Sequence, residues 1–454
     1  MSERRAILRG ASVSLVLQVA GLGLGYLGTA VLVRAMRPAE FGVYGFMLSL
    51  VTVLVLPAQF GVPTLVIRET AAGRQTGDYA AAKGLLLRSN QFALAAGLLL
   101  GLGTLALAAF LPMLRPNLPV LILALATLPL LALTAIRGAA LRGLGQVIAG
   151  QWPDVALKPA LVLVFVALAT PAAVPKLTAL CLLFGVVLPP AAMSSTLAMA
   201  LNLIATAIAF LVGLVLLWRA MPDELRRASP RFDSRRWIAS AIPLGVGGGI
   251  AVLNVQIAVL LMGALSRPPE EIGIYRVVAQ TAMLAALGYT AVIATLSPRF
   301  AAAQVAGDRA GLQRAASLGA VLSTAVCLPF ALFFLAFGGP FLGLVFRPEA
   351  AVGGPTLAVL GLAHLFNAAM GCSAAMLNMS GHERDFTISC AVGLVLQTVL
   401  ALALIPAFGL MGAAIASAVG VVAPNLLLWR YAHLRLGVES AIWGWGRKIS
   451  GPPL

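Results

Sequence analysis

The sequence predicts an all-α integral membrane protein of twelve transmembrane helices, arranged as two six-helix lobes related by an internal repeat. Three observations predict this class. The 454 residues are 61% hydrophobic and only 10% charged, apolar segments long enough to cross a bilayer recur along the chain, and the two halves match each other weakly. Soluble domains carry roughly 25% charged residues, so this composition excludes both soluble domains and disordered chains.

Apolar segments of about 18 to 27 residues alternate with clusters of Arg, Pro and Gly, and each is long enough to span a bilayer as a helix. The N-terminal half is expected to hold six helices, at 10–33, 42–66, 86–111, 118–136, 151–170 and 192–218. The C-terminal half is expected to hold six more, at 238–265, 272–296, 315–338, 352–377, 386–405 and 409–430. A further apolar segment at 177–193 is interpreted as a helix extension or a re-entrant piece, because a thirteenth span would reverse everything after it.

The basic residues predict the orientation of these helices. Of 31 Lys and Arg residues, six are expected on one side of the membrane: Arg34, Arg37, Arg115, Lys176, Arg267 and Arg347. Lys158 and Arg276 fall inside predicted helices, and the other 23, Arg137 among them, are expected on the opposite side. Cytoplasmic loops carry the excess of Lys and Arg, so both termini are predicted to be cytoplasmic in a multi-pass protein of the cell inner membrane. The same bias accounts for the net charge of +16 without a nucleic-acid partner.

The most polar segment divides the chain into its two predicted lobes. We expect an N-terminal lobe at 1–218, a basic cytoplasmic linker at 219–237, a C-terminal lobe at 238–431 and a cytoplasmic tail at 432–454. Three glycines of the first half match glycines of the second at a nearly constant offset: Gly42 with Gly273, Gly77 with Gly307, and Gly145 with Gly381. An even number of helices per lobe makes the repeats parallel, an arrangement found in secondary transporters.

Several segments resemble one family of bacterial membrane proteins. The stretch VRAMRPAEFGVY at 33–44, followed by QFGVP at 59–63 and VIR at 66–68, resembles the opening of polysaccharide flippases of the multidrug/oligosaccharidyl-lipid/polysaccharide exporter superfamily. EIGIY at 271–275 and LSPRF at 296–300 are similar to the corresponding helix of the second lobe. Arg37 departs from this pattern, because it stands where the family usually has a glycine.

The resemblance implies a MATE-like fold and a non-enzymatic activity. The expected activity is translocation of a polyprenyl-pyrophosphate-linked oligosaccharide by alternating access, for the synthesis of lipopolysaccharide, exopolysaccharide or another cell-surface glycan. The expected partners are this lipid-linked glycan, membrane lipid, and the glycosyltransferases and polymerase of the same pathway. Neither a cofactor nor a catalytic residue is expected.

Charged residues inside predicted spans are the sharpest candidates for the substrate cavity, because membrane-embedded charges are rare and usually face inward. Arg276 and Gln280 share one face of a helix at i, i+4 spacing, although Arg276 can instead extend to the membrane surface. Lys158 is a second cavity candidate, with Asp154 four residues before it. These two can also form a simple ion pair, and Asp154 is a candidate for ion coupling.

Polar residues near helix ends and along two helices complete the predicted site. Arg34 and Arg68 are candidates for phosphate binding, with lipid-headgroup anchoring as the alternative. Gln18, Asn254 and Gln256 are candidates for hydrogen bonding to sugars, although such groups more commonly join helices to one another.

Ion coupling and metal binding find little support in the sequence. His364 shares a helix face with Asn367 and is a candidate for proton coupling. The four cysteines lie in apolar segments without metal-ligand spacing, so we expect buried free thiols and no metal site.

Two other functions stay open. The first is an organic-cation antiporter of the same superfamily, which requires buried carboxylates; Asp154 alone lies clearly inside a predicted span. The second is a membrane glycan polymerase or ligase, which would need a large loop on the outer side of the membrane. The predicted outer loops are short.

Overall fold

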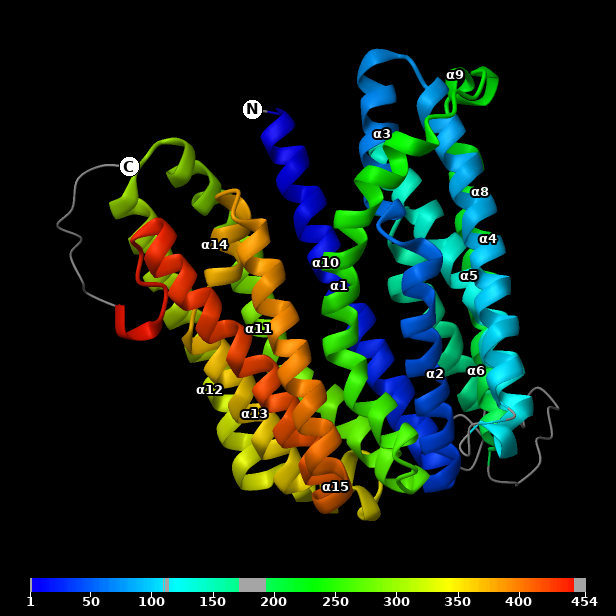
Figure 1. Cartoon of the computed structure of the whole chain (residues 1–454), viewed down its shortest axis with the longest axis vertical. Coiled ribbons are helices and arrows are strands. Elements are labelled where there is room, and N and C mark those ends of the chain that lie inside the picture. Colours follow the sequence, from blue (N-terminus) through cyan, green and yellow to red (C-terminus); the bar gives the residue numbers. More distant parts are fainter. Residues whose placement is uncertain (1, 109, 111–113, 171–192, 445–454) are drawn as a thin grey trace. The chain divides into compact units, whose positions relative to one another are not determined.

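The computed structural model describes residues 2–108, 110, 114–170 and 193–444, and these form an almost entirely helical protein (Figure 1). The described residues contain one isolated bridge, between Met36 and Met193, and no named strand. The chain divides into two compact units, Met1–Val252 and Leu253–Leu454. The predicted all-α membrane fold is confirmed, whereas the segment at 177–193 lies almost wholly outside the described residues.

The N-terminal unit contains these elements in order: α1 (Ser2–Ala35), α2 (Pro38–Gln59), α3 (Val62–Thr76), α4 (Ala80–Ala108), η1 (Arg115–Asn117), α5 (Leu118–Gly143), the π-helical turn η2 (Pro153–Leu157), α6 (Lys158–Ala169), α8 (Ser195–Ala220), α9 (Asp223–Arg227) and the first part of α10 (Ser234–Ala264). The C-terminal unit contains the rest of α10, then α11 (Pro269–Val305), α12 (Arg309–Val345), η4 (Pro348–Gly353), α13 (Gly354–Ala369), α14 (Ser373–Met379), α15 (Glu383–Leu436) and η5 (Ile442–Gly444).

Helices occupy all twelve predicted positions. Ten helices in the described part of the chain are long and apolar enough to cross a membrane. The longest, α15, has 54 residues and loses helical geometry at Gly409, so it supplies both predicted spans 386–405 and 409–430. The twelfth position, 151–170, is occupied by η2 followed by α6. Helices suit this environment because they satisfy every backbone hydrogen bond within the segment.

Three predicted helix boundaries are wrong. The predicted helix 352–377 ends as α13 at Ala369, and the chain turns at Gly371, which has a φ of 73°, before α14 begins at Ser373. The predicted helix 42–66 breaks after Gln59, where Gly61 has a φ of 73°, and continues as α3. The predicted helix 118–136 continues to Gly143, so Arg137 and Arg142 lie inside α5 and not in a cytoplasmic loop. The positive-inside skew remains when both are left out.

Helix α5 is central to the N-terminal unit, where it packs against α2, α3, α4 and α8. Small residues permit this close packing. A Cβ added to Gly97 of α4 would lie 3.0 Å from a Leu128 methyl, and one added to Gly143 would lie 2.8 Å from the Ile67 carbonyl oxygen. Helices in membranes commonly associate through such small residues, because hydrocarbon offers no hydrophobic driving force between them.

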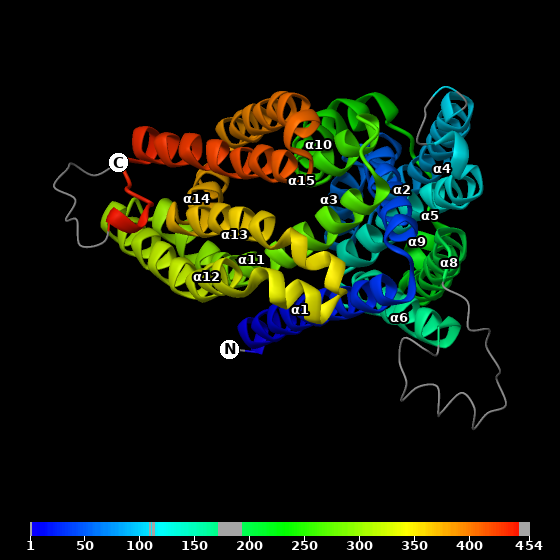
Figure 2. The ribbon, with the colours of Figure 1, turned by 90° about the horizontal axis from the view of Figure 1, so that it is seen from below.

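Helix α13 has the corresponding place in the C-terminal unit and contacts α11, α12 and α15. Figure 2 shows it between α12 and α15. The chain after α15 packs onto the same unit: Val438 is buried in a core cluster with Phe300 and Met376. Gln313 bonds both backbone groups of Glu439, through Nε2 at 2.7 Å and Oε1 at 2.8 Å. The beginning of the predicted tail 432–454 is therefore part of the folded unit.

The backbone supports the predicted repeat. Two of the three matched glycine pairs adopt left-handed conformations, with φ of 76° at Gly77, 65° at Gly307, 84° at Gly145 and 77° at Gly381. Such values favour glycine because a Cβ clashes with the backbone there.

Acidic residues also occupy matching positions in the two units. Glu40, in the first turn of α2, accepts a 2.6 Å hydrogen bond from the Ser195 amide at the start of α8. Glu271, in the first turn of α11, packs with Arg267 against Gly409 at the break in α15. Each unit thus places a carboxylate from its second span near the beginning of its sixth.

The matched turns give a test of the repeat. Gly77→Ala and Gly307→Ala should each lower the free energy of unfolding by about 1–2 kcal/mol, because a Cβ is strained at these φ values although space around both glycines is open. Gly103→Ala, within α4 and also in open space, should instead raise it by about 0.5–1 kcal/mol. Reversible unfolding in mixed detergent micelles measures all three. Equal effects at the turns and in the helix would contradict the assignment.

Candidate functional site

Charged side chains inside the N-terminal unit gather around Arg137 of α5. This arginine is 3% exposed and lies six residues before the end of the helix at Gly143. Its Nη2 donates to both carboxylate oxygens of Asp154 in η2, at 3.0 and 3.2 Å. Its Nη1 donates to the Ala209 and Phe210 carbonyl oxygens of α8, at 3.0 and 2.7 Å. One guanidinium therefore joins three helical segments.

Small residues and a change of helix type make room for this guanidinium. A Cβ on Gly213 would lie 2.2 Å from Cζ of Arg137, so only glycine fits opposite it on α8. Gly138 and Gly150 bring α5 and the chain before η2 together, because a Cβ on Gly138 would lie 2.7 Å from the Gly150 carbonyl oxygen. The π-helical turn then presents Asp154 to Arg137. Single π-turns within helices occur frequently at functional sites.

The cluster carries more positive than negative charge. Asp154 interacts electrostatically with Lys158 and Arg142 as well as with Arg137. Among the described residues, Arg137 is the cation that forms an ion pair with Asp154, and Lys158 forms none within 4 Å. Three basic side chains, on α5 and α6, thus share the one carboxylate of η2. Such an excess is costly in hydrocarbon unless water or an anion reaches it.

The sequence interpretation of these residues needs two corrections. The predicted bounds 118–136 place Arg137 in a loop, whereas it lies inside α5. The small, apolar residues Gly138 to Leu141 continue the segment, and the left-handed Gly145 marks the true end. The second correction concerns Asp154: its ion-pair partner is Arg137, which is distant in sequence, and not the neighbouring Lys158.

Helix α1 brings one predicted residue close to this cluster. Ser14 donates a 2.8 Å hydrogen bond to Gln151, and Gly21 packs against the Val155 carbonyl. Gln18 lies between these two contacts, on the same helix face by its spacing, and its side chain is exposed.

The two other predicted arginines of this unit lie on α1 and α3. Arg34 is exposed in the last turn of α1. Arg68 is 53% exposed on α3 and pairs with the adjacent Glu69 at 3.4 Å. Their roles in phosphate binding stay predictions.

The predicted residues of the C-terminal unit lie on three helices. Arg276 and Gln280 are half-buried, one turn apart on α11. Asn254 of α10 donates to the Cys390 carbonyl oxygen at 3.3 Å, which is the helix-joining alternative, and Gln256 is half-buried two residues further on. His364 of α13 is half-buried, and its Nδ1 has no hydrogen-bond partner. The cavity roles of these residues stay predictions.

Metal ligands and disulfides contribute little in the described part of the chain. No group of three or more His, Cys, Asp or Glu side chains could hold a metal ion there. Cys327 and Cys372 are buried free thiols and Cys390 is a half-buried one, whereas Cys181 lies outside the described residues.

A protein-family model described as polysaccharide biosynthesis protein matches residues 7–304 of the sequence. A search among curated proteins finds no match.

Solved structures that share the fold are membrane transporters. An inward-facing multidrug resistance MATE family transporter of the MOP superfamily superposes with a TM-score of 0.75, at 14% identity over 93% of this chain and 98% of that one. An outward-facing transporter of the same description gives 0.63, at 14% identity over 94% of each chain. A MOP superfamily transporter from Pyrococcus furiosus, described as having a binding pocket of reversed polarity, gives 0.63 at 15% identity over 94% and 95%. At these identities the likeness shows the fold.

The buried guanidinium gives a second test. Arg137→Ala should lower the free energy of unfolding by about 3–5 kcal/mol, because it leaves Asp154 and two carbonyl groups of α8 without their donor. Arg231→Ala is the matched control, since Arg231 is 66% exposed and pairs with Asp78 at 3.7 Å. It should cost about 1 kcal/mol or less. Unfolding of the purified protein in detergent measures both, and similar costs would show that Arg137 does not tie the unit together.

Proposed function

The chain belongs to the polysaccharide biosynthesis protein family, and we propose that it translocates a polyprenyl-pyrophosphate-linked oligosaccharide across the cytoplasmic membrane by alternating access. Its fold is that of MOP superfamily transporters. The observation that carries the proposal is the excess positive charge of the Arg137 cluster. The glycan serves cell-surface polysaccharide synthesis, with the glycosyltransferases and polymerase of the pathway as partners.

The charge of the cluster suits a pyrophosphate. Asp154 already accepts two hydrogen bonds from Arg137, so Lys158 and Arg142 have no carboxylate of their own in this cluster. A basic group and a phosphate 4 Å apart attract by roughly 4 kcal/mol at an effective dielectric constant of about 20. An entering pyrophosphate would therefore supply the negative charge that the cluster lacks.

The surroundings of the cluster suit the rest of the substrate. Gln18 is exposed on the helix face that packs against η2, and it offers an amide donor and acceptor for sugar hydroxyls. Sugar hydroxyls need such partners, because each unpaired polar group costs several kcal/mol in hydrocarbon. The polyprenyl tail can stay in lipid throughout.

The organic-cation alternative has less support. The protein has 15 acidic residues, and Asp154 alone lies well inside a predicted span, bound to Arg137. A cation would meet the excess positive charge around it. A glycan polymerase or ligase is likewise less favoured, because the predicted outer loops are short and this chain shares its fold with transporters.

Removal of the Lys158 charge tests the substrate. Lys158→Gln should reduce flipping of a fluorescent polyprenyl-pyrophosphate oligosaccharide in proteoliposomes at least about tenfold, because one charge contact with the phosphate is lost. Lys158→Arg should keep most of the activity. The control is Lys83→Gln, since Lys83 is the other lysine in the described part of the chain and donates to the Arg226 carbonyl of α9.

Two outcomes would count against the proposal. Normal flipping by a well-expressed Lys158→Gln protein would remove the cluster from substrate binding. Efflux of a cationic dye such as ethidium by the wild-type protein, without glycan flipping, would favour the antiporter.

Substitution of Arg276 tests whether a basic side chain of the C-terminal unit also binds the substrate. Arg276→Ala should lower flipping about tenfold and Arg276→Lys should restore part of it, because a point charge can still meet a phosphate. Arg347→Ala serves as control, because Arg347 is also half-buried and belongs to the same unit. If both Arg276 variants flip normally at normal expression, Arg276 has no part in transport.

A further inference from the structure

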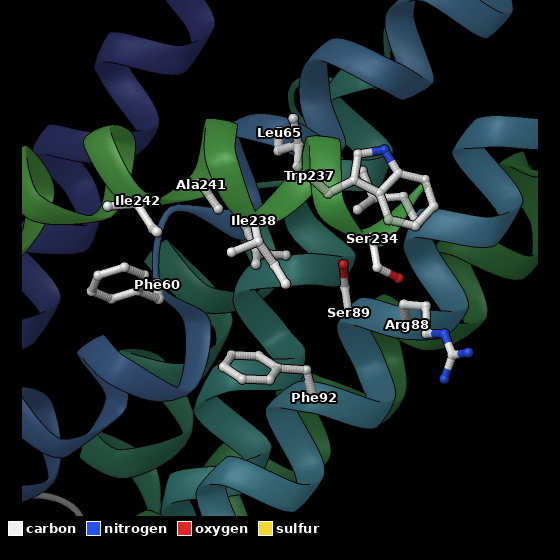
Figure 3. Close-up of a pocket in the computed structure, with 12 residues that line it drawn as sticks. Phe60, Leu65, Arg88, Ser89, Phe92, Ser234, Trp237, Ile238, Ala241 and Ile242 are labelled. Carbon is white, nitrogen blue, oxygen red and sulfur yellow. The ribbon is translucent and has the colours of Figure 1, made fainter. Parts of the chain in front are cut away.

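A cavity of about 450 Å³ lies in the N-terminal unit, apart from the residues of the Arg137 cluster (Figure 3). It is enclosed by the α2–α3 corner, by α4 near its beginning and by the first turns of α10. Twelve residues line it: Phe60, Val62, Leu65, Leu85, Arg88, Ser89, Phe92, Ser234, Trp237, Ile238, Ala241 and Ile242.

Most of the lining is apolar, and part of it is open. Phe92, Ile238 and Ile242 are 48%, 60% and 48% exposed, whereas Leu65 at the base is 1% exposed. The walls can therefore cover a flexible aliphatic chain along much of its length. Ligand pockets of similar size commonly combine such walls with a few fixed polar groups.

The polar groups of the cavity lie together on one side. Figure 3 shows the hydroxyls of Ser89 and Ser234 near each other, with Arg88 beside them. Ser89 is 3% exposed, and its Oγ has no hydrogen-bond partner. A buried hydroxyl without a hydrogen-bond partner lowers the stability of the fold. A ligand that provides a donor or acceptor for Ser89 would remove this cost.

A basic segment, residues 226–236, runs past this polar side. The Arg231 amide donates to the Ala80 carbonyl at 2.9 Å, and the Arg88 guanidinium stacks on the Phe232 ring at 4.9 Å. The segment contains five arginines, Arg226, Arg227, Arg231, Arg235 and Arg236, against one acidic residue, Asp233. Basic clusters next to a membrane helix attract anionic headgroups.

We propose that the cavity binds an anionic glycerophospholipid, with one acyl chain between Phe60, Phe92 and Ile238 and the headgroup at Arg88, Ser89 and Ser234. The phosphate accepts from Arg88, and a phosphate or ester oxygen accepts from Ser89. Trp237 lies at the same level, as interfacial indoles do. In the expected orientation, the lipid comes from the cytoplasmic leaflet.

The lining favours this lipid over the lipid-linked glycan. Three polar residues cannot pair the many hydroxyls of an oligosaccharide, yet they suffice for one phosphodiester. The site therefore goes beyond the proposed transport function and does not depend on it.

Native mass spectrometry of the purified full-length protein with phosphatidylglycerol tests the proposal. One phosphatidylglycerol should remain bound where phosphatidylcholine does not. Arg88→Gln should weaken retention about fivefold, the effect of one basic residue near an anionic headgroup. Arg115→Gln, also exposed but beyond the other end of α4, should change nothing.

The unpartnered hydroxyl provides a second, independent measurement. Ser89→Ala should raise the Tm of the lipid-free protein, because an unsatisfied group is removed, and should diminish the further rise on addition of phosphatidylglycerol. Ser323→Ala is the matched control, since its Oγ is also buried without a partner but lies outside the cavity. It should raise the lipid-free Tm and keep the full response to lipid.

Three results would overturn the proposal. The first is equal retention of phosphatidylcholine and phosphatidylglycerol. The second is an identical lipid response in Ser89→Ala and Ser323→Ala. The third is displacement of phosphatidylglycerol by a polyprenyl phosphate together with loss of flipping in Arg88→Gln, which would make the cavity a substrate site.

Discussion

The ion pair between Arg137 and Asp154 is the interaction on which the N-terminal unit depends. It joins α5, η2 and α8 through four hydrogen bonds to a side chain that is 3% exposed. A buried charge needs such partners, because an unpaired one is strongly destabilising. Glycine at position 213 and the π-turn around Asp154 are the structural conditions for this pairing. Because the Asp154 carboxylate is paired with Arg137, Lys158 and Arg142 have no carboxylate of their own in this cluster. Their positive charge therefore suits an anion.

The two units share the same arrangement of turns and acidic residues but differ in where their helices break. In both, a left-handed glycine follows the segment that begins with the second span, and an acidic residue of that span meets the beginning of the sixth. The N-terminal unit, however, breaks this segment at Gly61 into α2 and α3, whereas α11 runs unbroken for 37 residues. This break forms the corner between α2 and α3. Phe60, Val62 and Leu65 lie at the corner and line the cavity. The cavity therefore results from a difference between the two repeats and not from the duplication itself.

Hydropathy was sufficient to predict the number and position of the spans, because each segment must satisfy its own backbone in lipid. The glycine matches were sufficient to predict the repeat, because left-handed turns restrict the residue type. The candidate site was harder to predict. Arg137 resembles a loop residue when only neighbours in sequence are considered, and its burial depends on Gly213 and Asp154, which are distant along the chain. Asn254 illustrates the reverse case, since its amide joins α10 to the Cys390 carbonyl by a contact that no spacing rule indicates.

The segment after α15 has a practical consequence for experiments on membrane topology. Trp429 and His433 contact the Glu439 carboxylate, and the Ser440 hydroxyl bonds Ser373 at 2.7 Å. Gly371 passes so close to the Ser440 carbonyl that a Cβ there would overlap it. A reporter enzyme inserted between Gly437 and Gly444 would pull this segment away from its unit and report on a damaged protein. Reporters joined after Gly444 leave these bonds intact and are the ones whose compartment is informative.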